Sequence, residues 1–142
     1  MFILSKNLWE SDHIIKLHCT DNWDAPDTSI ITKCMLEVLK ELLMEAKSKH
    51  RPAYIICDCT KGELPPFMVA VTMAKFMAGI QDILDGGLQC SIIYTKSETH
   101  RMWFNRIFGM YTPTRPVHMV DSKKDIKQYI SNWYSSTESI TP

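Results

Sequence analysis

The chain has 142 residues, a length typical of one domain that buries its own hydrophobic core. Lys and Arg together number 16, as do Asp and Glu, which gives a formal net charge of zero. This balance argues against nucleic acid as a partner, because proteins that bind nucleic acid usually carry a basic surface.

Three further features bear on the compartment. Residues 1–6 contain neither the basic segment nor the long apolar segment of a signal peptide. The longest uncharged run near a predicted helix, residues 64–74, is too short to cross a bilayer. The five cysteines are an odd number, and four of them fall in segments that we expect to be buried: Cys34, Cys57, Cys59 and Cys90. We therefore predict a soluble, cytoplasmic protein with free thiols and no transmembrane segment.

Two strands and a long helix are predicted in the first third of the chain. Residues 2–5 and 14–20 have the apolar content of strands, which can pair as a hairpin. Residues 28–49 carry apolar side chains at helical spacing and charged side chains mostly on the opposite face, which is typical of a helix at a protein surface. The predicted buried stripe of this helix is Ile31, Cys34, Met35, Val38, Leu39, Leu42 and Ala46.

Residues 53–60 are predicted to be the central strand of the fold. The apolar side chains occupy both alternating faces, with Ile55, Cys57 and Cys59 on one and Tyr54 and Ile56 on the other. A strand that is apolar on both faces is typical of a parallel sheet covered by helices. Open α/β sheets usually place their sites at the carboxyl ends of the strands, so we expect the functional region at residues 58–63.

Helices and strands alternate in the rest of the chain. A proline pair begins the next predicted helix and a glycine pair follows it, as expected for helix ends. The predicted elements are a helix over residues 66–85, a strand over 89–95, a helix over 98–111, an edge strand over 115–120 and a helix over 122–133. The predicted order is β-β-α-β-α-β-α-β-α, an α/β sandwich with a mostly parallel central sheet and packed helices. We expect one domain over residues 1–134 and a polar tail over residues 135–142.

The last half of the chain has a characteristic succession of features. A buried strand at residues 90–95 is followed by an aromatic helix at residues 100–108, a strand that ends at Asp121, and a closing helix that reaches Trp133. This succession resembles the last half of the SpoIIAA-like fold of STAS domains, which are found in sulphate transporters and anti-sigma-factor antagonists. The resemblance implies an α/β sandwich that acts as a non-catalytic regulatory module by binding another protein.

One departure from the family pattern concerns phosphorylation. STAS domains that act as phosphorylation switches carry an Asp-Ser pair in the loop after the central strand. Residues 58–66 contain no serine, and Thr60 lies closer to the strand than the family's acceptor does. We therefore predict that this loop is not a phosphorylation switch and that the chain resembles members without the phosphoacceptor. The related CRAL-TRIO lipid-binding domain has a similar alternation of elements, but it is longer and encloses an apolar cavity.

The predicted helix over residues 66–85 has more apolar side chains than one core face needs. Its core arc is complete without Phe67, Met68 and Val71, and methionine and exposed aromatic side chains suit contact surfaces. We predict that a protein partner or a second copy of the chain binds there; alternatively, these side chains pack beneath the preceding loop. The predicted partner-binding residues are Thr60, Lys61, Gly62, Glu63, Leu64, Phe67, Met68 and Val71.

No catalytic, metal or cofactor site is predicted. His18 and Cys19 are neighbours, and adjacent side chains on a strand point to opposite faces. Cys57 and Cys59 match neither the spacing of a redox pair nor that of a zinc site. A thiol enzyme would need the fold to bring one of these two cysteines to His100.

Three classes of function therefore stay open. The leading prediction is an interaction or regulatory module. The second is a binder of a small apolar or lipid-like ligand, which requires a cavity between the sheet and the methionine-rich helix, lined by Met73, Met77 and Phe104. The third is an enzyme, which requires a titratable pair in a cleft, such as Asp58 and Glu63.

Overall fold

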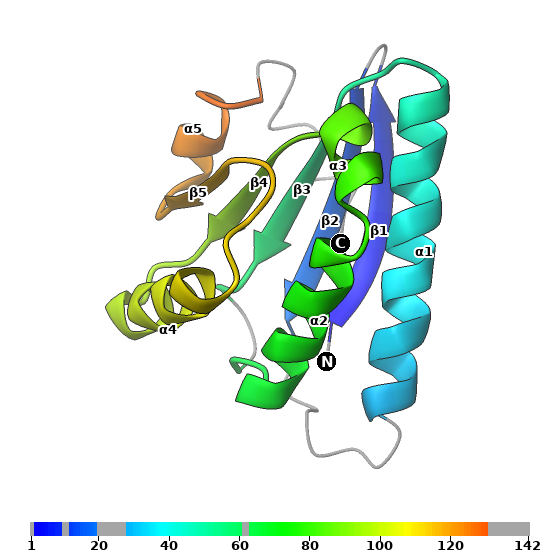
Figure 1. The fold of residues 1–142 in the computed structure, drawn as a ribbon. Helices are drawn as coiled ribbons and strands as arrows, with labels where there is room; N and C mark the ends of the chain where they lie inside the picture. Colours follow the sequence, from blue (N-terminus) through cyan, green and yellow to red (C-terminus); the bar gives the residue numbers. More distant parts are fainter. Residues whose placement is uncertain (1, 10–11, 20–27, 61–62, 131–142) are drawn as a thin grey trace.

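The computed structural model describes residues 2–9, 12–19, 28–60 and 63–130, and within them five strands form one sheet (Figure 1). The strands are β1 (Phe2–Trp9), β2 (Asp12–Cys19), β3 (Ala53–Asp58), β4 (Leu88–Tyr94) and β5 (Val117–Val120). They lie in sequence order across the sheet. β1 and β2 pair antiparallel, and each later strand joins its predecessor in parallel. The predicted hairpin and the mostly parallel sheet are confirmed.

The helices that connect the parallel strands cover the near face of the sheet in Figure 1. They are α1 (Thr28–Ser48), α2 (Phe67–Ala78), α3 (Gln81–Gly87) and α4 (Glu98–Met110); a short helix, α5 (Lys123–Ile126), follows the last strand. Each crossover steps to the next strand in the same direction, and right-handed crossovers of this kind place their helices on one face. α1 to α4 therefore share one core cluster, whereas α5, which follows the last strand, packs on the other face.

β3 is the middle strand and is buried from both sides. Ile55 belongs to the core cluster under α1 to α4, and Ile56 belongs to the cluster under α5; their exposed fractions are 5% and 0%. The predicted central strand is therefore confirmed. It ends at Asp58 and not at Thr60, although the Cys59 N–H still donates to the Tyr94 carbonyl of β4 at 2.8 Å.

The single helix predicted over residues 66–85 is wrong. The chain forms two helices there, α2 and α3, with a bend of 75° between them. Gly79 ends α2, and its N–H is shared between two carbonyls of the last turn at 3.1 Å each. Glycine has a low helix propensity, which favours a break at this position. The bend brings α3 against α1 and places Ile80 and Leu84 in the core.

The buried stripe predicted for α1 is also partly wrong. Cys34 is exposed and Val38 is 45% exposed, whereas Leu36 and Leu43 are almost completely buried. Apolar residues occupy two neighbouring lines along this helix, so their spacing alone does not decide which line faces the sheet. The observed stripe carries the larger leucines and consists of Thr32, Met35, Leu36, Leu39, Leu43 and Ala46.

The last two elements lie where they were predicted but are shorter: the strand spans Val117–Val120 instead of 115–120, and the helix spans only Lys123–Ile126, with turns at residues 127–129. β5 lies at the edge of the sheet. Ser122 caps α5, because its hydroxyl accepts a hydrogen bond from the Asp125 N–H at 3.3 Å. Trp133 and the predicted tail lie outside the described residues.

Among the described helices, none is long and apolar enough on its own to span a membrane; α2 and α3 meet that criterion only as a pair across their bend.

Candidate functional site

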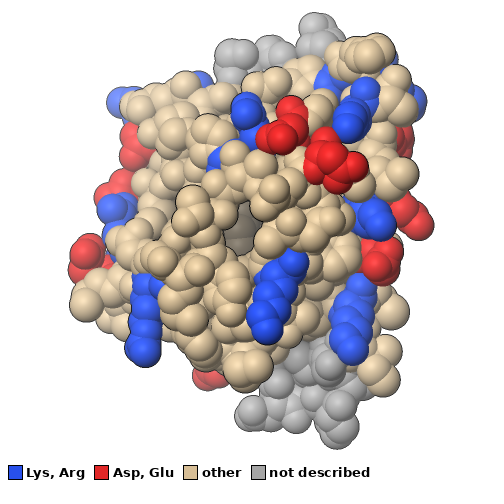
Figure 2. Space-filling model, viewed as in Figure 1, with Lys and Arg blue, Asp and Glu red and all other residues tan. Residues whose placement is uncertain are grey.

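A cavity of about 260 Å³ lies between the sheet, α2 and α4. Figure 2 shows its opening as a hollow surrounded by uncharged side chains. The strands supply the floor, which consists of Leu17, Ile55, Cys57, Ser91, Ile93 and Val117. The facing walls are Ala70, Met73, Ala74, Met77 and Ala78 of α2, and Trp103, Phe104, Ile107 and Phe108 of α4. Most of the lining is therefore apolar, as is usual for sites that bind small molecules.

The sequence of α2 explains why this space stays open. Ala70, Ala74 and Ala78 recur every four residues, so their small side chains lie along one side of the helix and leave the floor uncovered. Met73 and Met77 line the same cavity, and methionine side chains adapt easily to different shapes. The cavity wall on α2 thus combines small and adaptable side chains.

The wall on α4 is built from aromatic rings that contact one another. The Trp103 and Phe104 rings meet edge to face, with centroids 5.0 Å apart and an interplanar angle of 89°. Phe104 and Phe108 are stacked at 6.1 Å. Such pairs hold each other in place, so this wall is the more rigid of the two.

The connection between α4 and β5 closes one end of the cavity. Tyr111, Thr112, Pro113, Thr114 and Arg115 of this connection all line it. Arg115 is the one charged residue of the described lining, and its Nε donates to the Leu88 carbonyl at 2.9 Å. The polar groups of the cavity are thus concentrated near this segment, apart from Ser91 and Cys57 on the floor.

The cavity matches the requirement set for a ligand-binding function. Met73, Met77 and Phe104 were expected to line a cavity if the chain binds an apolar ligand, and the structure brings all three together around one space. Arg115 and the alanine stripe of α2 did not emerge from the sequence as site residues. The four-residue spacing of the alanines is a usable signal, whereas nothing in the sequence near Arg115 distinguishes it from a surface arginine.

The predicted partner-binding residues are only partly where they were expected. Met68 is 68% exposed and Phe67 is 37% exposed, with the Arg106 guanidinium 5.7 Å from the Phe67 ring centroid. Val71 is only 6% exposed, so its assignment to the surface is wrong. α2 packs against both α1 and α4 and therefore buries a wider arc than one core face.

The remaining predicted contact residues lie after β3. Thr60 and Glu63 are exposed, and Leu64 is half-buried against the core cluster. Lys61 and Gly62 lie outside the described residues. Asp58 accepts hydrogen bonds from the Thr60 N–H at 3.0 Å and from the Thr60 hydroxyl at 2.5 Å, which makes a tight turn at the strand end.

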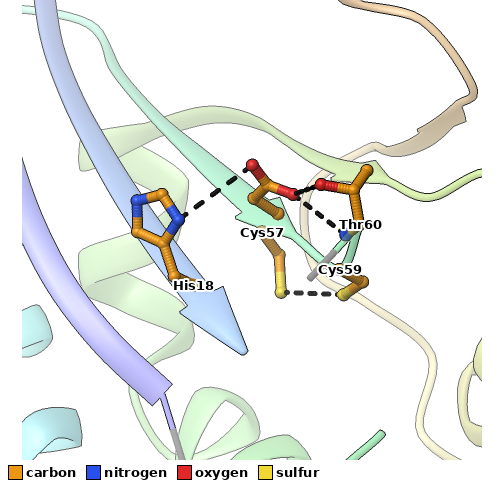
Figure 3. A network of polar contacts seen from close by, with 5 residues as sticks. His18, Cys57, Cys59 and Thr60 are labelled. Carbon is orange, nitrogen blue, oxygen red and sulfur yellow. Dashed lines mark hydrogen bonds and ion pairs between the residues drawn. The ribbon is translucent and has the colours of Figure 1, made fainter. Parts of the chain in front are cut away.

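The polar groups at the end of β3 form a small network (Figure 3). His18 Nδ1 lies 4.0 Å from the Asp58 carboxylate, and the Cys57 and Cys59 sulfurs lie 3.6 Å apart.

A separate polar pair follows β4, where His100 Nδ1 pairs with the Thr95 hydroxyl at 2.9 Å. Among the described residues, no group of three or more His, Cys, Asp or Glu side chains could hold a metal ion.

Four described cysteines form no disulfide and lie in different surroundings. Cys34 is exposed, Cys57 is half-buried, and Cys59 and Cys90 are buried. Burial raises the pKa of the Cys90 thiol above its ordinary value of 9.0, and the positive charge of Arg115 partly opposes this shift. The prediction that the cysteines form no disulfide is confirmed for these four.

Comparison with known proteins adds no family to this description. No protein-family model matches the chain, and no curated protein matches it either. The SpoIIAA-like resemblance therefore stays a prediction, and the function has to be argued from the cavity.

Proposed function

We propose that the chain is a non-catalytic module that binds a small apolar ligand in the cavity between the sheet, α2 and α4. The observation that carries the proposal is a concave, mostly apolar space of about 260 Å³ that opens at the surface (Figure 2). Burying such an apolar lining against a ligand is favourable by about 25 cal/mol per Å² of surface removed from water. Apolar walls with few polar groups are typical of sites that bind small molecules.

The dimensions and walls of the cavity suit a slender molecule. Taking about 30 Å³ for a group the size of a water molecule, 260 Å³ holds on the order of ten heavy atoms. The aromatic wall of α4 and the adaptable Met73 and Met77 on α2 offer one rigid and one flexible surface. An alkyl chain or a small ring system fits this description better than a peptide does.

The chemistry of the lining supports binding over catalysis. Within the part of the chain that the structure describes, the lining contains no His, Asp or Glu that could act as a general base. The Asp58 carboxylate, which was considered for an acid pair, is engaged by Thr60 at the end of β3. We therefore assign the cavity a binding role.

Isothermal titration of the full chain with decanol tests this proposal, because decanol has about the required size and carries no charge. We expect saturable binding of one molecule per chain and a negative heat-capacity change, which is the most reliable sign of apolar burial. Absence of saturable binding to decanol and to a bulkier neutral probe, N-phenyl-1-naphthylamine, would refute the proposal.

A second proposal is that the chain binds a protein partner or another copy of itself, as expected for a SpoIIAA-like module. The observation in its favour is the exposure of Met68 and Phe67 at the start of α2, the first helix after β3. The burial of Val71 makes this surface smaller than predicted from the sequence. It is therefore ranked below ligand binding.

A further inference from the structure

We infer that the ligand of the cavity carries a carboxylate head group and that Arg115 binds it. This inference rests on the proposed function, since it names the class of apolar ligand. The ligand would be an apolar monocarboxylic acid whose chain lies between α2 and α4. Its head group would lie at the connection between α4 and β5.

Arg115 uses only part of its hydrogen-bonding capacity on the described residues. A guanidinium has five N–H donors, and Nε uses one of them on the Leu88 carbonyl. Within the part of the chain that the structure describes, Arg115 forms no ion pair with a carboxylate. The two terminal nitrogens thus remain available, and the bond at Nε fixes the direction of the side chain.

The positive charge of Arg115 lies in a mostly apolar environment. Arg115 is half-buried and lines a cavity whose other described lining residues are all uncharged. A partly desolvated charge is unfavourable unless a counter-ion or hydrogen-bond partner compensates it. An anionic ligand would supply that partner, and the planar guanidinium fork matches the two oxygens of a carboxylate.

The single charge of Arg115 matches the charge of a carboxylate head group. A phosphate monoester carries close to two negative charges at neutral pH, whereas a carboxylate carries one. Arg115 supplies a single positive charge, so it neutralises a carboxylate but not a phosphate monoester. Thr112 and Thr114 line the cavity from the same segment, and their hydroxyl groups can donate to the remaining lone pairs of the carboxylate.

The experiment compares four ligands that share one alkyl chain: decanoate, decanol, decyl phosphate and decyltrimethylammonium. Affinities are measured by isothermal titration at neutral pH with the full chain. We expect decanoate to bind at least about tenfold more tightly than decanol, as is typical when a charged group gains a hydrogen-bonded partner. Decyl phosphate should bind no more tightly than decanoate, and the cationic ligand should bind most weakly.

Two variants assign the preference to Arg115. Arg115→Gln should bind decanol as the wild type does and lose the preference for decanoate. Arg115→Lys keeps the charge but loses the fork, so it should keep only part of the preference. Arg106→Gln is the matched control, because Arg106 is an exposed arginine of α4 that does not line the cavity; it should leave the preference unchanged.

The outcomes separate this inference from the proposed function. Equal binding of decanoate and decanol by the wild type would overturn the inference and leave apolar binding intact. A preference that survives in Arg115→Gln would overturn the role of Arg115, and tighter binding of decyl phosphate would overturn the carboxylate. If no decyl ligand binds but N-phenyl-1-naphthylamine does, the inference fails and apolar binding stands; if neither binds, the proposed function itself fails. Should Arg115→Gln not fold, the ligand series on the wild type and on Arg115→Lys decides the matter.

Discussion

Arg115 and Leu88 are joined across 27 residues of sequence by a hydrogen bond of 2.9 Å from the Arg115 Nε to the Leu88 carbonyl. Leu88 is the first residue of β4, and Arg115 belongs to the connection that leads into β5. Both residues line the cavity, so one bond holds this connection against the sheet and also orients the only charged side chain of the described lining. The same contact thus stabilises the fold and holds the side chain that we propose to bind the ligand.

Filling the cavity should have opposite effects on stability and on binding. Ala74 lines the cavity from the middle of the alanine stripe of α2, so Ala74→Leu places a larger apolar side chain in the open space. We expect the free energy of unfolding to rise by up to about 2.4 kcal/mol, because leucine adds three carbon atoms at about 0.8 kcal/mol each when buried. Chemical denaturation measures this change, and titration should show at least about a tenfold loss of decanol affinity.

The matched control for this variant is Thr72→Leu. Thr72 is an exposed residue of the same helix and does not line the cavity, so its replacement should leave decanol affinity unchanged. Wild-type affinity in Ala74→Leu would mean that decanol binds elsewhere on the molecule.

Truncation of the central strand should weaken the fold without affecting the cavity. Ile56 is completely buried on the sheet face that α5 covers, opposite the cavity floor. We expect Ile56→Ala to lower the free energy of unfolding by roughly 2–5 kcal/mol, because it removes buried apolar volume and leaves a void. Urea denaturation provides the measurement. A loss close to zero would contradict the burial of β3, and decanol affinity should stay at the wild-type value.

Several of these features could be predicted from the sequence because they depend on local patterns. The alternation of residues 53–60 identified a strand that is buried on both faces, and Ile55 and Ile56 lie in two different core clusters as a result. Met73 and Met77 were correctly associated with a cavity, because the methionines follow a helical spacing that faces the sheet.

The errors arose where packing between distant elements decides the outcome. A single glycine within an apolar helix does not by itself predict a break, and the bend at Gly79 is completed by the contact of α3 with α1. Val71 is buried because α2 lies between two helices, which its own sequence does not reveal. Arg115 joins the site through a hydrogen bond to a residue of another element, so no local pattern marks it.

The cysteines should differ in reactivity according to their exposure. Cys34 is exposed and Cys90 is buried, and burial raises the pKa of the Cys90 thiol. Because the thiolate is the reactive form, we expect iodoacetamide to modify Cys34 at least about tenfold faster than Cys90 at pH 8. Peptide mass spectrometry follows both sites in one sample. Equal rates would mean that Cys90 is accessible in the folded protein.

The same pKa shift predicts a dependence of stability on alkaline pH. The folded protein retains the Cys90 proton to a higher pH than the unfolded chain, whose thiol titrates near 9.0. The contribution of this thiol is therefore complete below that value and is lost as the pH rises through the folded pKa. The stability lost between pH 8 and pH 10 should be smaller in Cys90→Ala than in the wild type. An equal loss in both proteins would show that Cys90 makes no such contribution.

The start of α2 allows the second proposed function to be tested with a matched pair of substitutions. Met68 is 68% exposed, so Met68→Glu should change the free energy of unfolding by no more than about 0.5 kcal/mol, whereas Val71→Glu should cost several times more because it buries a charge. If this surface mediates self-association, analytical ultracentrifugation should show weaker association of Met68→Glu. Unchanged association would argue against the surface.

The most direct test of the central claim is a methyl NMR titration of the full chain with decanol, using methionine labelled with carbon-13 at its methyl group. Met73 and Met77 line the cavity, whereas Met68 and Met102 are exposed on α2 and α4 and do not line it. Binding in the cavity should shift the Met73 and Met77 signals in a saturable manner and leave those of Met68 and Met102 in place. Shifts confined to Met68 and Met102, or no shifts at all, would contradict the proposal that this cavity binds a small apolar ligand.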